Sequence, residues 1–147
     1  MNFVNQKNVV FASILLILFG WLSPAISHEV NKSAVILLVA KNKAGKTVGT
    51  GSGFIIQPEG TIITNYHVLV DAYSVKAYFQ NGNQVDVTGI YKIDRKKDFA
   101  ILKLTEGSYS TLELGESSSL HDYDYTSALG YLSENVKENN GIMEGIV

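Results

Sequence analysis

Between residues 33 and 104 the chain is a succession of short, largely apolar segments, each of strand length and each ended by residues that favour turns. About six such segments occur, at residues 33–41, 47–57, 61–65, 74–80, 84–94 and 98–104. Six antiparallel strands on so short a stretch favour a closed barrel, because a closed barrel leaves no edge strand unpaired. The sequence therefore predicts an all-β fold built on a six-stranded antiparallel barrel.

Alternation within these segments predicts which side chains share a face. In the segment at 74–80, one face carries Val75, Ala77 and Phe79. In the next segment, at 84–94, one face carries Val85, Val87, Gly89, Tyr91 and Ile93. Asn81-Gly82 predicts a hairpin between the two segments, because this pair adopts positive φ at little cost. Residues 67–72 do not alternate and predict one helical turn. Glycines fit tight bending or close backbone approach at positions 49, 51, 53 and 89.

Composition limits the classes of function. The 147 residues suffice for one ordinary domain, and a net charge of −2 gives no push toward nucleic acid or an anionic membrane. The chain has no cysteine, which excludes disulfides, thiolate metal sites and a cysteine nucleophile. Core burial and strand pairing must therefore hold the fold together.

The first 27 residues predict a secretory signal peptide. A start with one positive charge precedes an uncharged apolar stretch over residues 9–22, and small residues stand at Ala25 and Ser27. We expect cleavage between Ser27 and His28, with export to the periplasm or the medium. The alternative is an uncleaved membrane anchor, for which this apolar stretch is short.

The character of the chain changes after residue 104. Residues 105–124 are polar and rich in Ser, Gly and acidic residues, which is typical of a connection. Residues 125–132 and 141–147 predict two further strands, separated by a polar loop at 133–140. We expect the barrel to occupy residues 33–111, and the segment beyond residue 112 to be loosely held.

A histidine and an aspartate form the candidate site. His67 follows the strand end Thr64-Asn65 and opens a helical turn, which places its imidazole at the rim of the barrel, where it can act as a general base. Asp98 stands where a turn enters a buried strand, and a carboxylate there can orient the imidazole while shielded from water. Taken alone, His67 also fits an ordinary hydrogen-bonded histidine, and Asp98 also fits a solvated turn residue.

The two segments that carry these residues, "GTGSGFIIQPEGTIITNYHVL" and "KDFAILKL", resemble the HtrA branch of the trypsin-like serine peptidases. "LELGESSSL", "ALGY" and "MEGIV" are similar to later segments of that family, in the same order, although Tyr131-Leu132 follows Gly130 where the family usually has a pair such as Asn-Pro. The resemblance implies a trypsin-like barrel at 33–111, and at 112–147 a connection and the start of a second barrel. It also implies His67 as general base, Asp98 as its orienter, a polypeptide substrate, no cofactor and no metal.

The resemblance places the nucleophilic serine in a Gly-Asp/Asn-Ser-Gly-Gly loop of the second barrel, and these 147 residues contain no such segment. Ser52 lies between glycines in a first-barrel strand, where the family keeps a structural serine. Ser117, Ser118 and Ser119 fit turn or helix caps, and Ser127 falls within a predicted strand. We therefore expect a serine endopeptidase represented by an incomplete chain, either a fragment or a natural truncation, that is inactive alone.

Two other functions remain open. The chain could be a non-catalytic exported β-barrel protein that keeps His67 and Asp98 by descent and binds peptides or a protein partner. It could also be an unrelated small β-barrel in which the two residues coincide by chance. His28, His67 and His121 are too scattered along the sequence to predict a metal site.

Overall fold

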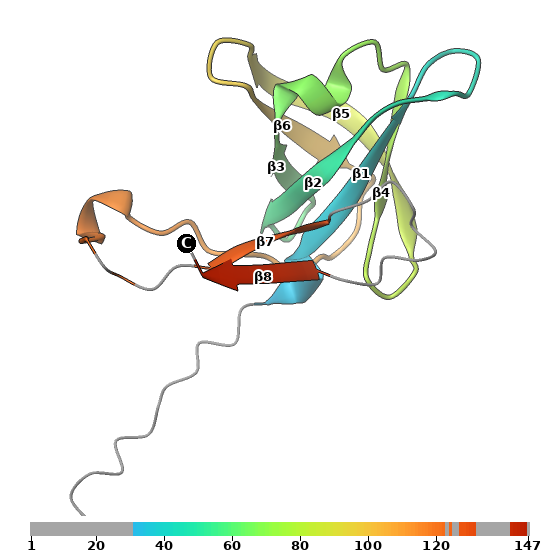
Figure 1. The fold of residues 1–147 in the computed structure, drawn as a ribbon. Coiled ribbons are helices and arrows are strands. Elements are labelled where there is room, and N and C mark those ends of the chain that lie inside the picture. Colours follow the sequence, from blue (N-terminus) through green and yellow to red (C-terminus); the bar gives the residue numbers. More distant parts are fainter. Residues whose placement is uncertain (1–30, 123, 125–126, 132–141, 147) are drawn as a thin grey trace, which may run out of the picture.

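A computed structural model describes residues 31–122, 124, 127–131 and 142–146 (Figure 1). The elements in chain order are the 3-10 helix η1 (Lys32–Ala34), β1 (Val35–Lys41), β2 (Thr47–Gln57), β3 (Thr61–Thr64), the 3-10 helix η2 (Tyr66–Leu69), β4 (Ser74–Tyr78), β5 (Gln84–Asp94), β6 (Phe99–Leu104), the 3-10 helix η3 (Ser117–Ser119), β7 (Ser127–Tyr131) and β8 (Ile142–Ile146). The predicted signal peptide and the loop at 133–140 lie outside the described residues. None of the helices described is long and apolar enough to span a membrane.

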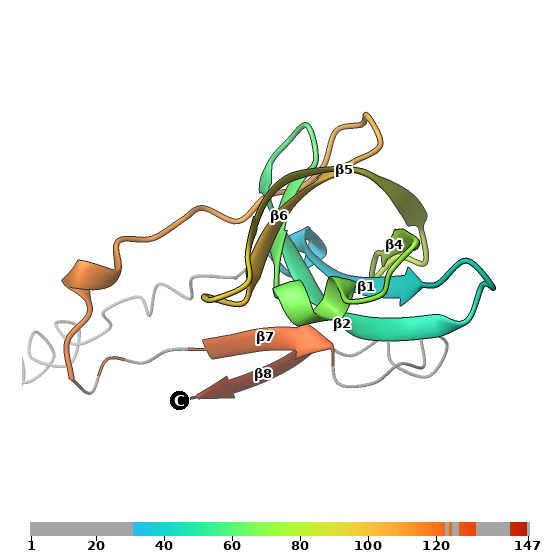
Figure 2. The same cartoon turned by 90° about the horizontal axis from the view of Figure 1, so that it is seen from above.

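Six antiparallel strands close into a barrel in the order β1-β2-β3-β6-β5-β4, which confirms the predicted fold class. Figure 2 looks along this barrel and shows the ring of strands β1 to β6. A separate two-stranded sheet, β7 paired with β8, lies outside the ring. The two further strands expected beyond residue 124 are therefore present as an antiparallel pair.

The barrel interior is filled by buried aliphatic side chains from β1, β2, β3, β4, β6 and η2. The buried members of this core are Ile36, Leu38, Ile55, Ile62, Val68, Ala77, Ala100, Leu102 and Leu104. Val75 and Phe79 pack against it from the same face as Ala77, as their alternation predicted. Burial of this apolar surface is the main stabilising contribution in a chain without disulfides.

Strand β1 is buried on both faces, which explains its uninterrupted apolar sequence. Ile36 and Leu38 belong to the barrel core, whereas Val35, Leu37 and Val39 alternate with them and are still only 3%, 2% and 7% exposed. Strand β7 lies against β1 and β2 on the outside of the barrel (Figures 1 and 2). An outer layer of chain therefore covers this part of the barrel wall.

Strand β5 spans residues 84–94 as predicted, but its predicted common face is wrong beyond Gly89. The register with β6 shifts between Val87 and Gly89 and again between Ile90 and Lys92. Such bulges add a residue to one strand and break the alternation of side chains. Tyr91 is consequently 64% exposed instead of facing the core.

A segment after β6 fastens the end of the barrel opposite η2. The Tyr109 amide donates to the Pro58 carbonyl (3.0 Å), and the Leu112 amide donates to the Ile55 carbonyl (2.8 Å). The ring of Tyr109 stacks on Phe79 with centroids 5.8 Å apart. Residues 105–112 therefore extend the barrel contacts past the last strand, and we refer to them as the basal strap.

Candidate active site

The short helix η2 places His67 at the rim of the barrel. His67 is its second residue, and the next residue, Val68, is 2% exposed and anchors the turn in the core. Gly49 and Gly51 of β2 face Val68, because a Cβ at residue 49 would overlap the Val68 carbonyl and one at residue 51 would overlap a Val68 methyl group. The expected close backbone approach at these two glycines is therefore confirmed, and it seats the turn that carries His67.

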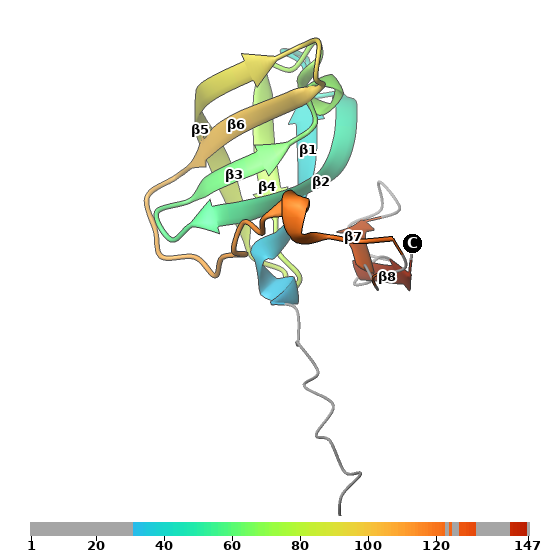
Figure 3. The same ribbon diagram turned by 90° about the vertical axis from the view of Figure 1, so that its left-hand side faces the viewer.

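Asp98 ends the tight tip of the β5–β6 hairpin, which lies beside η2 (Figure 3). The Asp94 carboxylate shapes this tip by accepting hydrogen bonds from the amides of Lys96 and Lys97, each at 3.0 Å. Asp98 has φ of 51°, in the left-handed region that a side chain other than glycine rarely adopts. Because this conformation is not extended, Asp98 lies outside the strand, which begins at Phe99 and not at residue 98 as expected.

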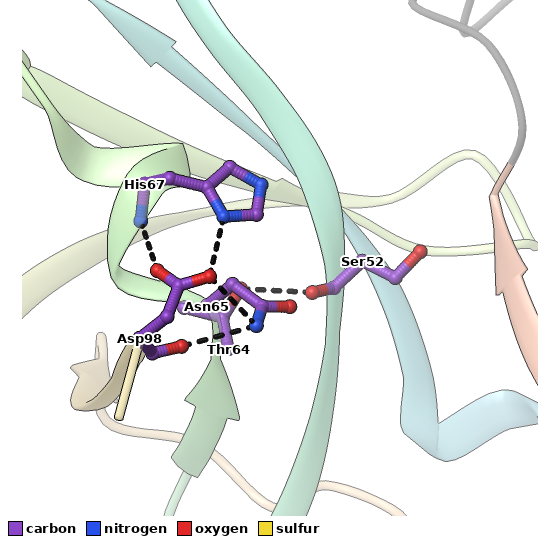
Figure 4. A network of polar contacts seen from close by, with 5 residues as sticks. All are labelled: Ser52, Thr64, Asn65, His67 and Asp98. Atoms are coloured by element: carbon purple, nitrogen blue, oxygen red, sulfur yellow. Dashed lines mark hydrogen bonds and ion pairs between the residues drawn. The ribbon is translucent and has the colours of Figure 1, made fainter. Parts of the chain in front are cut away.

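The structure brings His67 and Asp98 into direct contact (Figure 4). Asp98 Oδ2 lies 2.7 Å from His67 Nδ1, and Oδ1 accepts a hydrogen bond from the His67 amide at 2.9 Å. An ionised carboxylate only accepts hydrogen bonds, so the Nδ1 of a neutral imidazole must carry the proton. Nε2 then keeps its lone pair and can accept a proton from another group.

Asn65 is a third member of the site that the sequence pattern did not single out. Its Nδ2 donates to the Asp98 carbonyl at 3.0 Å and also lies 3.3 Å from Asp98 Oδ2. These contacts fix both the backbone and the carboxylate of Asp98. The available signal was a polar amide side chain at the end of an apolar strand, two residues before His67.

The electrostatics of the pair favour an ionised carboxylate. The hydrogen bond with the His67 side chain, followed by that from the His67 amide, lowers the pKa of Asp98 below its ordinary value of 3.8. The side chains of His67 and Asp98 are 66% and 43% exposed. The expectation that Asp98 is shielded from water is therefore wrong in the described structure, since no described segment covers the tip of the hairpin.

Ser52 is tied to the chain outside the barrel and not to the imidazole. Its Oγ accepts a hydrogen bond from the Tyr131 amide at 2.8 Å, and its carbonyl accepts one from Thr64 Oγ1 at 2.8 Å. Figure 4 shows that the Ser52 hydroxyl points away from His67. This geometry agrees with a structural serine that links β2 to β7.

The other serines and histidines considered lie elsewhere. Ser117–Ser119 form η3, where the Glu116 carboxylate accepts a hydrogen bond from the Ser118 amide (3.1 Å), so Glu116 caps this turn. Ser127 begins β7. His121 Nδ1 lies 3.9 Å from an Asp124 carboxylate oxygen, a looser contact than that of His67. Within the described ranges, no group of three or more His, Asp or Glu side chains could hold a metal ion.

A pocket of about 320 Å³ adjoins the site where β2 and β3 face β7. Its polar lining comes from Ser52, Thr64 and Asn65, and its apolar lining includes Phe54 and Leu129. Asn65 therefore contacts Asp98 on one side and lines this pocket on the other.

Comparison with known proteins matches residues 51–147 to a family model described as "Trypsin-like peptidase domain". The serine protease HTRA1A of Danio rerio is 32% identical over 111 residues, covering 74% of this chain and 22% of the relative. The serine protease HTR4 of Rattus norvegicus is 39% identical over 82 residues, covering 55% of this chain and 17% of the relative.

Two further matches differ in kind. The anti-sigma-I factor RsgI9 of Acetivibrio thermocellus is 37% identical over 103 residues, covering 69% of this chain and 14% of the relative. The crystal structure of the serine endoprotease from Yersinia pestis superposes with a TM-score of 0.66 at 25% identity, covering 79% of this chain and 40% of that one. The matched part of the chain thus covers 14–22% of the curated relatives described here and 40% of the solved structure.

Proposed function

The chain belongs to the trypsin-like peptidase family, and from this premise we propose that its barrel supplies the general base and the orienting carboxylate of an HtrA-type serine endopeptidase. His67 is the base and Asp98 the orienter. The observation that carries this proposal is the double contact of one carboxylate with the Nδ1 and the amide of His67, at 2.7 and 2.9 Å. It leaves Nε2 as the ring nitrogen that can take a proton.

In this mechanism, His67 Nε2 accepts the proton of a serine hydroxyl as that oxygen attacks the carbonyl carbon of a peptide bond. Asp98 holds the required tautomer and stabilises the imidazolium that forms. The imidazolium then gives its proton to the departing amine. Hydrolysis of the acyl-enzyme by water repeats the same proton transfers, and the substrate class is polypeptide.

The serine is the missing component. The 147 residues contain no Gly-Asp/Asn-Ser-Gly-Gly segment, and the Ser52 hydroxyl accepts its hydrogen bond from the Tyr131 amide. We propose that the serine and its oxyanion site come from a second barrel of a longer protein, which starts in the region of β7 and β8. Loss of the triad serine costs about a millionfold in turnover, so the 147-residue chain is expected to be inactive alone.

The decisive test uses the longer protein, expressed with its second barrel, and cleavage of an unfolded polypeptide such as reduced casein. His67→Ala is expected to abolish cleavage, and Asp98→Asn to lower kcat about ten-thousandfold because the tautomer is no longer held. Cleavage that survives His67→Ala would refute the assigned base.

A matched control comes from the second histidine with a nearby carboxylate. His121 Nδ1 lies 3.9 Å from Asp124, and its side chain is 83% exposed. His121→Ala is therefore expected to leave cleavage unchanged. A fluorophosphonate probe applied to the 147-residue chain provides the complementary test, since labelling would show an activated serine that this proposal excludes.

The match to the anti-sigma-I factor RsgI9 favours one alternative, a non-catalytic barrel that binds a peptide or a protein partner. That relative, 37% identical over 103 residues, is named as an anti-sigma-I factor and not as a protease. Under this alternative, the longer protein would not cleave casein and fluorophosphonate would not label it. Its partner binding would survive His67→Ala.

We further propose that the protein is exported through the N-terminal signal peptide at residues 1–27. The support is the apolar stretch at 9–22 followed by small residues at 25 and 27. N-terminal sequencing of protein recovered from cells is expected to start at His28. A start at Met1 in the membrane fraction would favour the uncleaved anchor.

A further inference from the structure

The guanidinium of Arg95 lies over the ring of Tyr66, 5.4 Å from its centroid. Tyr66 directly precedes His67 on η2, and Arg95 lies in the same hairpin tip as Asp98. Each partner of this stack is therefore close in the chain to one partner of the His67–Asp98 pair. The stack joins the same two segments by a contact that involves neither of those residues.

The two segments need such a contact because regular strand pairing ends before they meet. The last residue pair of the β3–β6 ladder in this direction is Thr64 with Ala100. Beyond it, η2 and the hairpin tip belong to different connections, and the hydrogen bonds between them are formed by solvent-exposed groups. Water competes for exposed hydrogen bonds, so the tip can open without disrupting the barrel.

We propose that Arg95 and Tyr66 are positioning residues that brace the Asp98 tip against the His67 turn. The planar guanidinium suits this task because it stacks on an aromatic face while its rim stays hydrated. A cation–π contact at an exposed site is expected to favour the closed arrangement about two- to fivefold. The catalytic meaning of the brace rests on the proposed function, whereas its existence does not.

Amide hydrogen exchange, measured by NMR on the 147-residue chain, tests the brace. The His67 amide donates to Asp98 Oδ1, so its exchange reports opening of the tip. After correction for intrinsic rates, Tyr66→Leu and Arg95→Gln are each expected to speed this exchange about two- to fivefold. The double variant is expected to exceed neither single variant, because both changes remove the same contact. Tyr66→Phe keeps the ring face and is expected to match the wild type.

The Val70 amide is the internal reference, because it donates to the His67 carbonyl within the same turn and does not contact Asp98. Unchanged His67 exchange, additive effects, equal acceleration at Val70, or a Tyr66→Phe effect as large as that of Tyr66→Leu would each overturn the brace. Arg95 is exposed, so Arg95→Gln leaves the core intact and stands as a test even if Tyr66→Leu fails to fold. A longer protein without peptidase activity would refute the proposed function and leave this result unaffected.

Discussion

The carbonyl of Val68 occupies the space that a side chain at Gly49 would need. Because Val68 is buried and directly follows His67, the absence of a side chain at residue 49 sets the depth at which η2 sits on β2. The position of the imidazole therefore depends on a glycine in another strand.

Replacement of this glycine is expected to displace the turn. Gly49→Ala should lower the free energy of unfolding by about 1–3 kcal/mol, as overpacking in a filled interior does, and should weaken the His67–Asp98 contact. Urea denaturation and exchange of the His67 amide measure the two effects. Gly89→Ala is the matched control, since a Cβ there meets only the Cβ of Lys103 at 3.4 Å. Equal losses for the two variants would contradict this role of Gly49.

Stability should depend on acid pH through Asp98. Its pKa is lower in the folded chain than its ordinary value of 3.8, so the ionised carboxylate stabilises the fold above that pH. This contribution is lost as the pH falls through the ordinary value and then through the lowered one. The difference in unfolding free energy between the wild type and Asp98→Asn is therefore expected to shrink below about pH 5. Urea titrations at several pH values measure it.

The His67 background provides a control for that prediction. The hydrogen bond with the His67 side chain is the largest cause of the lowered pKa of Asp98. When the wild type and Asp98→Asn both also carry His67→Gln, the acid-dependent difference between their unfolding free energies is expected to be smaller. A difference that stays the same in both backgrounds would assign the effect to another partner.

The hydrogen bond from Tyr131 to Ser52 is expected to hold β7 on the barrel. Ser52→Ala removes one hydrogen bond, worth about 1 kcal/mol, and should speed exchange of the Tyr131 amide about fivefold. The amides of β6 should be unaffected. Ser74→Ala, at the exposed start of β4, is the control. If Tyr131 exchanges at the wild-type rate in Ser52→Ala, this link does not hold the strand.

The basal strap is expected to depend on the Tyr109 ring more than on its hydroxyl. Tyr109→Phe removes the 2.8 Å hydrogen bond to the Thr105 carbonyl and should cost about 0.5–1.5 kcal/mol of unfolding free energy. Tyr109→Ala also removes the stack on Phe79 and should cost about 2–3 kcal/mol. Tyr73 is 69% exposed, so Tyr73→Phe should stay within about 0.5 kcal/mol. Thermal or urea unfolding ranks the three.

The strands could be predicted because their signals are local. Alternation and turn residues located β5 at 84–94, and the unbroken apolar sequence located β1. The bulges of β5 could not be predicted in this way, because they depend on its register against β6. Tyr91 consequently faces solvent, although its sequence position matched the buried face.

The candidate site was predictable only in part. His67 and Asp98 could be singled out because their segments resemble a known family. Asn65 and the Arg95–Tyr66 stack could not, since their contacts join residues about thirty positions apart whose types are common at strand ends and turns. The exposure of Asp98 was also missed, because it depends on which segments lie over the hairpin tip.

The left-handed backbone of Asp98 sets backbone strain against side-chain contacts at one position. Glycine would adopt a φ of 51° without strain, whereas a residue with a Cβ pays about 1 kcal/mol. Asp98→Gly would relieve this strain, but it would also remove the ionised carboxylate that stabilises the fold and that is the only carboxylate in contact with His67 among the residues described. Engineering of this scaffold would need to hold residue 98 fixed and seek its gains elsewhere.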